Sequence, residues 1–468
     1  MNFPLVTPSL DWIPHPNPTA NPPQDKAMQL AGRIWIEHTL PLTLAEKKQF
    51  MKAGWLTSVR AITKSWRGYH CRRCGNSTQR LLAPWPCNCG QNCRYCRACI
   101  EMGRIASCTS LYLWTGADLQ WITTPDACQW NGTLSPFQQQ ASTTIQKAIV
   151  DRRELLVWAV CGAGKTEMLF QGLAKAFEQG MRVCLATPRV DVVQELKPRF
   201  AEAFPQVKLA ALFGGTKDVD NGSQFIVATT HQLYKYARAF DAIIIDEVDA
   251  FPYHADKSLH FAANRAAKHH AARIYLTATP RWHMKWRSHW KHLPTTFVPQ
   301  RYHGHPLPIP QFISCFGIPS YMKKEKLPPS FYQWLQQRNK ARRLIIFVPT
   351  IPMAEALAER IENAVFVHSE DEHRADKITR FREKQFPVLI ATTILERGVT
   401  FPSVDVAVLQ SDHAVFDEAA LVQIAGRAGR SADDPTGEVI FFHSGRTEAM
   451  EKARHSIMTM NKRAERGW

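Results

Sequence analysis

Short runs of consecutive apolar residues alternate with amphipathic stretches between residues 155 and 280. Continuous apolar runs are typical of strands buried on both faces, and amphipathic helices connect such strands in parallel. The pattern therefore predicts a doubly wound parallel sheet, with function at the carboxyl ends of its strands. The expected strands are Leu155–Val160, Val183–Pro188, Phe225–Thr230, Ala242–Asp246 and Arg273–Thr279.

A second alternating unit extends from about residue 310 to residue 468. Proline-rich His305–Pro310 and the charged run Lys323–Lys326 mark the junction region. A chain of 468 residues is too long for a single core, so we expect two α/β lobes, residues 115–297 and 305–468. The strands expected in the second lobe are Leu344–Val348, Val365–His368, Val388–Thr392, Val404–Leu409 and Glu438–His443.

The first expected strand runs into a glycine-rich loop that precedes the amphipathic run Glu167–Gln179. Strand, loop and helix in this order form the context of a Walker A motif, in which backbone amides and the helix N-terminus hold a phosphate. Lys165 would reach the β- and γ-phosphates of ATP, and the Thr166 hydroxyl would coordinate Mg²⁺. Ala159 stands where the full motif has its first glycine. The loop residues expected to bind nucleotide are Gly162, Ala163, Gly164, Lys165 and Thr166.

Two acidic residues and one glutamine complete the expected nucleotide site. Asp246 and Glu247 follow an apolar strand, as a Walker B motif does. Asp246 would hold Mg²⁺, and Glu247 would position and activate the attacking water. Gln138, at the start of a predicted helix, has the donor and acceptor needed to contact the adenine edge.

Polar residues also end three other strands of the first lobe. Pro188 and Arg189 follow one strand, and Thr230 and His231 follow another. We expect both pairs to contact a nucleic-acid backbone. We expect Thr277–Thr279 to couple the binding and hydrolysis of ATP to these nucleic-acid contacts.

The second lobe has no glycine-rich phosphate loop of its own. It has instead the segments Ala391–Thr400 (ATTILERGVT) and Gln423–Arg430 (QIAGRAGR). Arg427 and Arg430 are three residues apart, so they share one helical face and can point together across a cleft. Facing a γ-phosphate they would act as arginine fingers, and without such a partner they would form a solvated face.

Seven of the twelve cysteines lie between Cys71 and Cys99. Two CxxC pairs about twenty residues apart are typical of a structural zinc site. Cys71 and Cys74 form the first pair, whereas Cys93–Cys96 and Cys96–Cys99 both have the right spacing for the second. The thiols that remain, Cys87 and Cys89 among them, are either spare or ligands of a second ion.

The same segment is strongly basic. From Arg60 to Arg104 it holds nine Lys and Arg residues and a single acid, with aromatic rings between them. Basic groups neutralise phosphates and rings stack on bases, which predicts a surface for single-stranded nucleic acid; alternatively the rings form a small core around zinc. The net charge of +17 also favours a polyanion, either nucleic acid or an anionic membrane. The expected contacts in this segment are Arg72, Arg73, Arg94 and Arg97.

Residues 1–65 are expected to form a partly disordered N-terminal segment, and residues 66–108 a zinc module. The proline- and asparagine-rich start favours disorder, while residues 28–65 do not decide between helix and strand. No apolar run reaches the roughly 18 residues that span a bilayer, and the N-terminus lacks the features of a signal peptide. We therefore expect a cytoplasmic protein with reduced cysteines.

The motifs GAGKT, TPR, TTH, DEVD, TAT, ERG and QIAGRAGR, in this order, resemble those of superfamily 2 helicases of the DEAD/DEAH-like group over about residues 130–445. The resemblance implies two RecA-like parallel-sheet lobes behind a small N-terminal zinc module, with ATP bound between the lobes. It also adds Gln423 to the catalytic residues, Gly398 to the nucleotide site and Thr393 to the nucleic-acid contacts.

A finer resemblance is to the ComFA family of late-competence ATPases, in WAVCGAGKTEM, QIAGRAGR and YCRACIEMGR. The family's zinc site uses two CxxC pairs, which match Cys71, Cys74, Cys96 and Cys99. The resemblance implies ATP hydrolysis on single-stranded DNA at the inner face of the cell membrane, where one transforming strand is drawn through the ComEC channel. It implies ComFC-like and DprA-like partners, and we also consider a homo-oligomer.

Two alternatives are less favoured. A replication-restart helicase resembling PriA also combines zinc with this motor, but its cysteines are inserted within the motor, whereas here all seven clustered cysteines precede Lys165. A non-catalytic zinc adaptor on a degenerate helicase scaffold would not need intact Lys165, Asp246 and Glu247.

Overall fold

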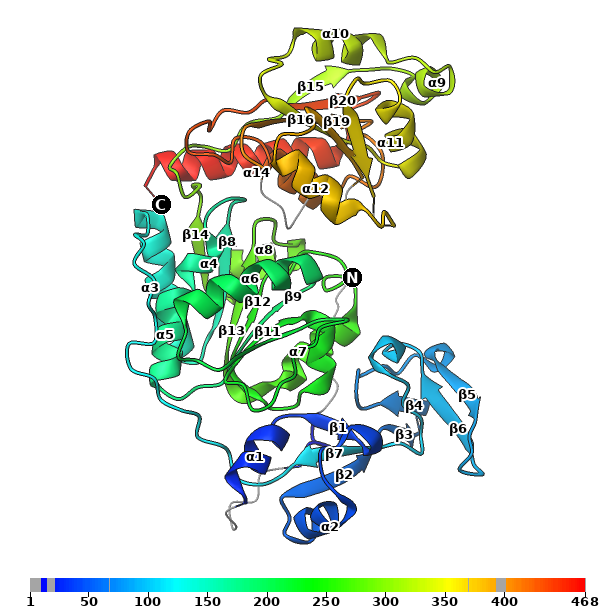
Figure 1. Ribbon diagram of the computed structural model, residues 1–468, viewed down its shortest axis with the longest axis vertical. Coiled ribbons are helices and arrows are strands. Elements are labelled where there is room, and N and C mark those ends of the chain that lie inside the picture. The colour runs from blue at the N-terminus through cyan, green and yellow to red at the C-terminus, as the bar shows by residue number, and fades with distance from the viewer. Residues whose placement is uncertain (1–9, 15–21, 67, 369, 393–400, 468) are drawn as a thin grey trace.

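The structure is a computed structural model that describes residues 10–14, 22–66, 68–368, 370–392 and 401–467. Two α/β lobes are stacked along the long axis of the molecule, with lobe 2 above lobe 1 in Figure 1. An N-terminal domain lies below lobe 1, and its cysteine-rich module extends to the right. The expected fold class, two parallel-sheet lobes behind an N-terminal cysteine-rich unit, is confirmed.

Lobe 1 contains a seven-stranded sheet in which every neighbouring pair of strands is parallel. All five strands expected from the sequence are present. Its strands, in spatial order, are β10 (Leu209–Leu212), β11 (Phe225–Thr229), β9 (Val183–Thr187), β12 (Phe240–Ile245), β13 (Ala267–Thr277), β8 (Glu154–Ala159) and β14 (Thr295–Val298). Its helices are α3 (Pro136–Val150), α4 (Lys165–Met168), α5 (Phe170–Glu178), α6 (Val190–Ala203), the 3-10 helix η4 (Thr230–Lys235), α7 (Lys257–Ala266) and α8 (Trp282–His289).

Lobe 2 contains a six-stranded sheet that is also parallel throughout. Its spatial order is β15 (Gln311–Ser314), β20 (Val439–His443), β19 (Val404–Leu409), β16 (Arg343–Phe347), β18 (Val388–Ala391) and β17 (Ala364–Val367). Its helices are α9 (Ile318–Lys323), α10 (Pro329–Gln337), α11 (Ile351–Ala358), α12 (Arg374–Arg382), α13 (Glu418–Ala425) and α14 (Glu448–Glu465).

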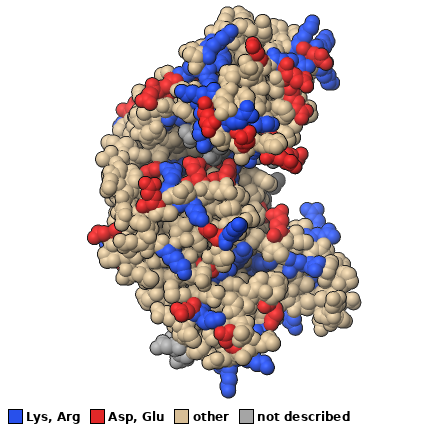
Figure 2. Space-filling view, in the orientation of Figure 1, with Lys and Arg blue, Asp and Glu red and all other residues tan. Residues whose placement is uncertain are grey.

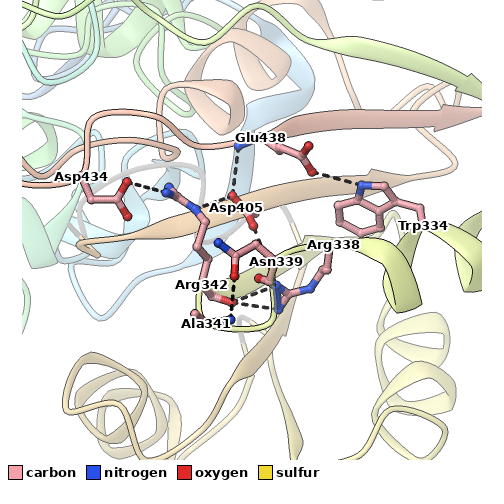
Figure 3. Close-up of polar contacts among 8 residues, drawn as sticks. All are labelled: Trp334, Arg338, Asn339, Ala341, Arg342, Asp405, Asp434 and Glu438. Atoms are coloured by element: carbon pink, nitrogen blue, oxygen red, sulfur yellow. Dashed lines mark hydrogen bonds and ion pairs between the residues drawn. The ribbon is translucent and has the colours of Figure 1, made fainter.

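A buried carboxylate fixes the chain that follows α13 to the sheet of lobe 2 (Figure 3). Asp405 is 1% exposed and accepts a hydrogen bond from Arg342 Nε at 2.8 Å and another from the Glu438 backbone amide at 3.0 Å. Arg342 also pairs with Asp434. Because Asp434 and Glu438 lie in the segment between Arg430 and β20, this network holds in place the chain that directly follows the arginines of QIAGRAGR.

The N-terminal domain is a three-stranded antiparallel sheet, β1 (Ile34–Ile36), β7 (Ser110–Trp114) and β2 (Leu56–Arg60), in that order. Helices α1 (Gln24–Leu30) and α2 (Leu44–Lys52) accompany it. Strands β1 and β2 lie before the cysteines and pair with β7, which lies after them. Residues 1–65 and 66–108 are therefore not two successive units, as the sequence suggested: the cysteine-rich module is an insertion between two neighbouring strands.

The cysteine-rich module consists mainly of two hairpins. β3 (Ile62–Ser65) pairs with β4 (Gly68–Cys71), and β5 (Leu82–Pro86) pairs with β6 (Asn92–Cys96). Short 3-10 helices, η2 (Gln79–Leu81) and η3 (Ile100–Met102), follow the two cysteine pairs. Within the described residues, no helix has both the length and the apolar character needed to cross a bilayer.

Candidate nucleotide site and nucleic-acid surface

A cavity of about 270 Å³ lies between the lobes at the carboxyl end of β8. It brings together residues that are far apart in the sequence. The expected residues that line it are Gly162, Ala163, Gly164, Lys165, Thr166, Asp246, Glu247, Gln423, Arg427 and Arg430. The structure thus places the lobe 2 arginines on the same cavity as the lobe 1 phosphate loop.

The phosphate loop needs glycine at two positions, and both are present. Gly162 and Gly164 have φ angles of +80° and +68°, in the left-handed region that side chains disfavour. Ala159, where the full motif has glycine, lies instead at the end of β8 and is fully buried. The departure from the full motif therefore falls on a strand residue, and the loop itself keeps the backbone freedom that a phosphate cradle requires.

Lys165 faces the acidic residues at the end of β12. Its Nζ lies 4.0 Å from Asp246 Oδ1, and the Glu247 amide donates to the same carboxylate at 2.8 Å. Burial by itself would lower the pKa of Lys165, but the charges of Asp246 and Glu247 outweigh it and raise that pKa. Lys165 therefore stays protonated, which suits contact with phosphate oxygens, and the carboxylates and the Thr166 hydroxyl are the oxygen ligands that Mg²⁺ prefers.

Gln138 is held against the phosphate loop. Its Nε2 donates to the Ala163 carbonyl at 2.9 Å, and its Oε1 accepts from the Ser135 amide at 2.8 Å as part of the cap of α3. Both ends of the amide are thus engaged within lobe 1. The contact to adenine stays a prediction, and what this geometry does provide is a brace for the loop at Ala163.

The lobe 2 arginines are deeply placed. Arg427 is 2% exposed, and Arg430 Nε donates to the Gly426 carbonyl at 2.9 Å. Burial and the neighbouring charge of Arg430 lower the pKa of Arg427. Across the lobe boundary, Cys161 Sγ donates to Gln423 Oε1 at 3.0 Å, so the start of the phosphate loop contacts the helix that leads to both arginines.

Sequence reasoning missed Arg301, which lies in the connection between the lobes. It is 1% exposed, lines the nucleotide cavity and donates to the Gly429 carbonyl. Its Nε and Nη2 have no hydrogen-bond partner among the described residues, and burial lowers its pKa to about 10. No motif marks this residue: it reaches the phosphate loop because β14 pairs with β8, and the next residue, Tyr302, donates its amide to the Gly162 carbonyl at 3.0 Å.

Asp249 connects the acidic motif to the Thr277–Thr279 segment. The Thr277 hydroxyl donates to Asp249 Oδ1 at 2.5 Å, and the Thr279 hydroxyl donates to Oδ2 at 2.6 Å. Two residues later, Arg281 reaches Asp417, the cap of α13, at 3.1 Å. A continuous polar path therefore runs from the end of β12 to the lobe 2 helix that precedes Arg427.

The expected backbone-binding residues differ in accessibility. Pro188 is buried, and Arg189 is half-buried with Nε 3.6 Å from Asp191. Thr230 is fully buried, and its hydroxyl has no hydrogen-bond partner in the described part of the chain. His231 beside it lies 4.0 Å from Glu101 of the cysteine-rich module. Thr393 and Gly398 lie outside the described residues.

Four buried cysteines converge within the module. The sulfurs of Cys71, Cys74, Cys96 and Cys99 all lie within 4.8 Å of one another, with pairs at 4.0 Å (Cys71 and Cys99) and 3.6 Å (Cys74 and Cys96). Zinc bonds of about 2.3 Å in a tetrahedron place sulfurs about 3.8 Å apart, so this donor set fits zinc. The spacing left two partners open, and the geometry selects Cys96–Cys99.

Arg73 supports this cysteine site and is not available to a phosphate. It is 5% exposed, and its guanidinium donates to Cys99 Sγ at 3.2 and 3.3 Å and to the Cys99 carbonyl at 2.6 Å. We therefore remove Arg73 from the expected nucleic-acid contacts. The positive charge of the arginine offsets the negative charge that thiolates would bring.

The other arginines of the module lie against aromatic rings. Arg94 lies over Tyr69, with its Cζ 4.9 Å from the ring centroid, and Arg97 Nε donates to the Tyr95 hydroxyl at 3.1 Å. Arg104 lies 3.7 Å above Trp85. These rings form neither a closed core nor bare stacking platforms, because they carry arginines on their outer faces. Figure 2 shows the molecule hollowed on the right, with basic side chains bordering this hollow on the module's side.

A buried arginine of lobe 1 anchors the module. Arg265, on α7, is fully buried and donates to the carbonyls of Arg72, at 3.2 Å, and Arg73, in the first cysteine knuckle. It also donates to the Tyr234 carbonyl of η4 at 2.9 Å. Since η4 begins at Thr230, one side chain ties the cysteine knuckle to the segment expected to contact nucleic acid.

Comparisons with known proteins agree with this architecture. Residues 21–113 match the family model "Competence protein ComFA N-terminal domain", residues 131–282 match "Type III restriction enzyme, res subunit", and residues 324–432 match "Helicase conserved C-terminal domain". The competence protein ComFA of Bacillus subtilis (strain 168) is 43% identical over 420 residues, which is 88% of this chain and 90% of that protein. The chain belongs to the ComFA family.

A second ComFA, from Streptococcus pneumoniae (strain ATCC BAA-255 / R6), is 39% identical over 440 residues, 92% of this chain and 98% of that protein. The solved structure of RecG bound to a three-way DNA junction shares the fold, with a TM-score of 0.50 and 18% identity over 74% of this chain and 49% of that one. This member of the ComFA family is thus a competence-associated, ATP-hydrolysing DNA helicase or translocase, for which the family implies ATP, Mg²⁺ and nucleic-acid binding.

Proposed function

We propose that this ComFA-family protein hydrolyses ATP in response to single-stranded DNA and uses it to translocate along one strand during the uptake of transforming DNA across the cytoplasmic membrane. The observation that carries the proposal is the attachment of the basic module to lobe 1 beside Thr230 and His231, through Arg265. Through this attachment, the module's arginines continue the surface of lobe 1 that is expected to contact the DNA strand.

The nucleotide residues have separate roles in this proposal. Lys165 and the loop amides hold the phosphates, Thr166 and Asp246 hold Mg²⁺, and Glu247 orients and deprotonates the attacking water. Mg²⁺ neutralises phosphate charge when it is bound. Arg427 and Arg430 stabilise the charge that develops on the γ-phosphate, and Gln423 holds their helix against Cys161.

Movement requires the lobes to open and close around the nucleotide. The path from Asp249 through Thr277 and Arg281 to Asp417 couples the acidic motif to the helix before Arg427. A change at the γ-phosphate therefore reaches both the lobe boundary and the carboxyl ends of the strands that carry the expected DNA contacts.

Zinc at the first cysteine site has a structural role in this proposal. The four thiols are buried, and none faces the nucleotide cavity. Because a structural metal supplies folding energy directly, zinc would hold the two hairpins in the arrangement that Arg265 recognises.

The family resemblance also leads us to propose ComFC-like and DprA-like partners and a position beside the ComEC channel at the inner face of the membrane. The net charge of +17 supports this position, because clustered Lys and Arg bind anionic lipid headgroups. Sedimentation with anionic but not neutral vesicles, weakened by salt, is the measurement that supports a peripheral membrane position.

The central experiment compares ATP turnover with no nucleic acid and with single-stranded DNA, duplex DNA and RNA. We expect single-stranded DNA to stimulate turnover most. Glu247→Gln serves as the control for contaminating ATPases, because it keeps the fold and removes the proposed base. Equal turnover with all polymers, or no stimulation by any, would contradict the proposal while leaving the helicase assignment intact.

A further inference from the structure

A second group of four cysteines lies at the other end of β6 from the first. The sulfurs of Cys87, Cys89, Cys93 and Cys108 all lie within 4.8 Å of one another. Two pairs, Cys87 with Cys108 and Cys89 with Cys93, are 3.4 Å apart. These distances are close to the value of about 3.8 Å expected between sulfurs of a tetrahedral zinc site.

The four thiols come from three different places in the chain. Cys87 and Cys89 lie in the turn between β5 and β6, Cys93 lies within β6, and Cys108 lies just before β7. The backbone brings Cys108 there, because the Ser107 amide donates to the Arg94 carbonyl at 2.8 Å, which sets the exit segment beside β6. Thiols from three segments thus converge on one point, as the ligands of a metal ion do.

Sequence spacing leaves open whether Cys87 and Cys89 bind a second ion, because they are too close for the usual knuckle, and it does not connect Cys108 with them. Two disulfides, Cys87–Cys108 and Cys89–Cys93, are the other chemistry that such proximity allows. They would not require all four sulfurs to meet, and the twelve cysteines, all within the described ranges, form no disulfide in this structure.

We propose that Cys87, Cys89, Cys93 and Cys108 bind a second zinc ion, so that the protein carries two structural zincs. The second ion joins the tip of the β5–β6 hairpin to the segment that leaves the module. Cys93 is the cross-strand partner of Trp85, whose ring carries Arg104. The ion therefore fixes the face of the hairpin on which the basic and aromatic side chains lie.

The two sites differ in accessibility. All four cysteines of the first site are buried, whereas Cys89 is exposed and Cys87 and Cys108 are half-buried. A chelator should therefore remove zinc in two phases, with the second site released first. Accessibility to the chelator thus gives a readout that does not depend on ATPase activity.

The test is the zinc content of the purified full-length protein, measured by elemental analysis. We expect about two zinc ions per chain for the wild type and about one for the Cys89→Ser/Cys108→Ser double variant, with the fast phase of release lost. Cys128→Ser, outside both groups, is the matched control and should keep both. Cobalt substitution should show tetrahedral thiolate bands of two sites in the wild type and one in the double variant.

Other outcomes overturn the proposal. One zinc per chain in the wild type, lost only with Cys71→Ser, would leave the first site alone. Two zincs in both the wild type and the double variant would place the second ion elsewhere. Should the double variant lose all metal through unfolding, Cys108→His decides: it must keep two ions with a shifted cobalt spectrum. Disulfides found by mass spectrometry in protein purified without oxidant would replace zinc as the chemistry of this group.

Discussion

Lys165 and Glu247 line one cavity but act on different parts of the reaction. Lys165 meets the phosphates of the bound nucleotide, so its charge contributes before any bond breaks. Glu247 follows Asp246, with which its amide is hydrogen bonded, and in the proposed role it acts only on the attacking water. Substitution should therefore separate binding from chemistry.

We expect Lys165→Ala to weaken nucleotide binding by tenfold or more, and Glu247→Gln to bind ATP with near wild-type affinity but to lower kcat by roughly 10²–10⁴, the usual contribution of a general base. Binding of a fluorescent ATP analogue and steady-state ATPase assays measure the two effects. Lys452→Ala, an exposed residue paired with Glu448 on α14, is the matched control. Equal turnover by wild type and Glu247→Gln would exclude Glu247 as the base.

Several site residues could be predicted because they belong to short motifs, in which residue types with a known chemical role occur at a characteristic spacing. Lys165 and Asp246 each follow a buried strand, so local sequence determines their position. Arg427 and Arg430 do not share a helical face as expected, because α13 ends at Ala425, but both still line the nucleotide cavity. Arg301 and Cys108 could not be predicted, because each joins its site only through contacts distant in sequence. For Arg73 the prediction was wrong. The basic composition of the segment suggested an exposed arginine, but in the folded protein Arg73 is buried against Cys99.

At the scale of elements, the central strands of both lobes were predicted, and of the four edge strands only β17 was. Strands β10, β14 and β15 lie at sheet edges, where a short or mixed apolar run does not distinguish strand from helix or loop. Strands β1 and β2 were undecided because their partner β7 lies beyond the whole cysteine-rich module. The local pattern of apolar and polar residues does not predict pairing between strands that are so far apart in the sequence.

A second prediction concerns the arginines of the cysteine-rich module. If Arg72, Arg94 and Arg97 contact phosphates, replacing all three with Gln should flatten the salt dependence of single-strand binding by about 0.7 per lost contact in the log–log slope. Maximal ATP turnover at saturating DNA should survive, because none of the three lines the nucleotide cavity.

Fluorescence anisotropy over a range of salt concentrations measures the slope. Replacing three exposed lysines of lobe 2, Lys323, Lys324 and Lys326, with Gln makes the same change in net charge and is the matched control. A slope that falls equally in both variants would show a general charge effect, and an unchanged slope in the arginine variant would assign the module's charge to another partner.

At the scale of the whole molecule, two of the contacts between the three folded parts bear on how they act together. The first crosses the boundary between the lobes, where Arg281 and Lys285 of lobe 1 pair with Asp417 and Glu418 at the start of α13. The second is Arg265, which lies between α7, η4 and the first cysteine knuckle. Nucleotide state and module position therefore both act on lobe 1, which lies between lobe 2 and the N-terminal domain (Figure 1).

The insertion point of the module allows a direct test of its independence. Arg60 and Ser110 are cross-strand partners at the ends of β2 and β7, so residues 61–109 can be replaced by an Asn-Gly turn that fits a tight hairpin. We expect this variant to fold, to keep DNA-independent ATPase activity, to contain no zinc and to bind single strands less tightly. Circular dichroism, turnover and metal content measure these outcomes, and loss of the fold would show that the module is integral to lobe 1.

Because the module enters and leaves through adjacent residues of one hairpin, its presence does not constrain the order of strands in either lobe. A lineage could lengthen, exchange or discard this attachment in a single genetic event without redesigning the ATPase. The same junction is a position at which a different DNA-binding domain can be inserted by protein engineering while the two ATPase lobes stay unchanged.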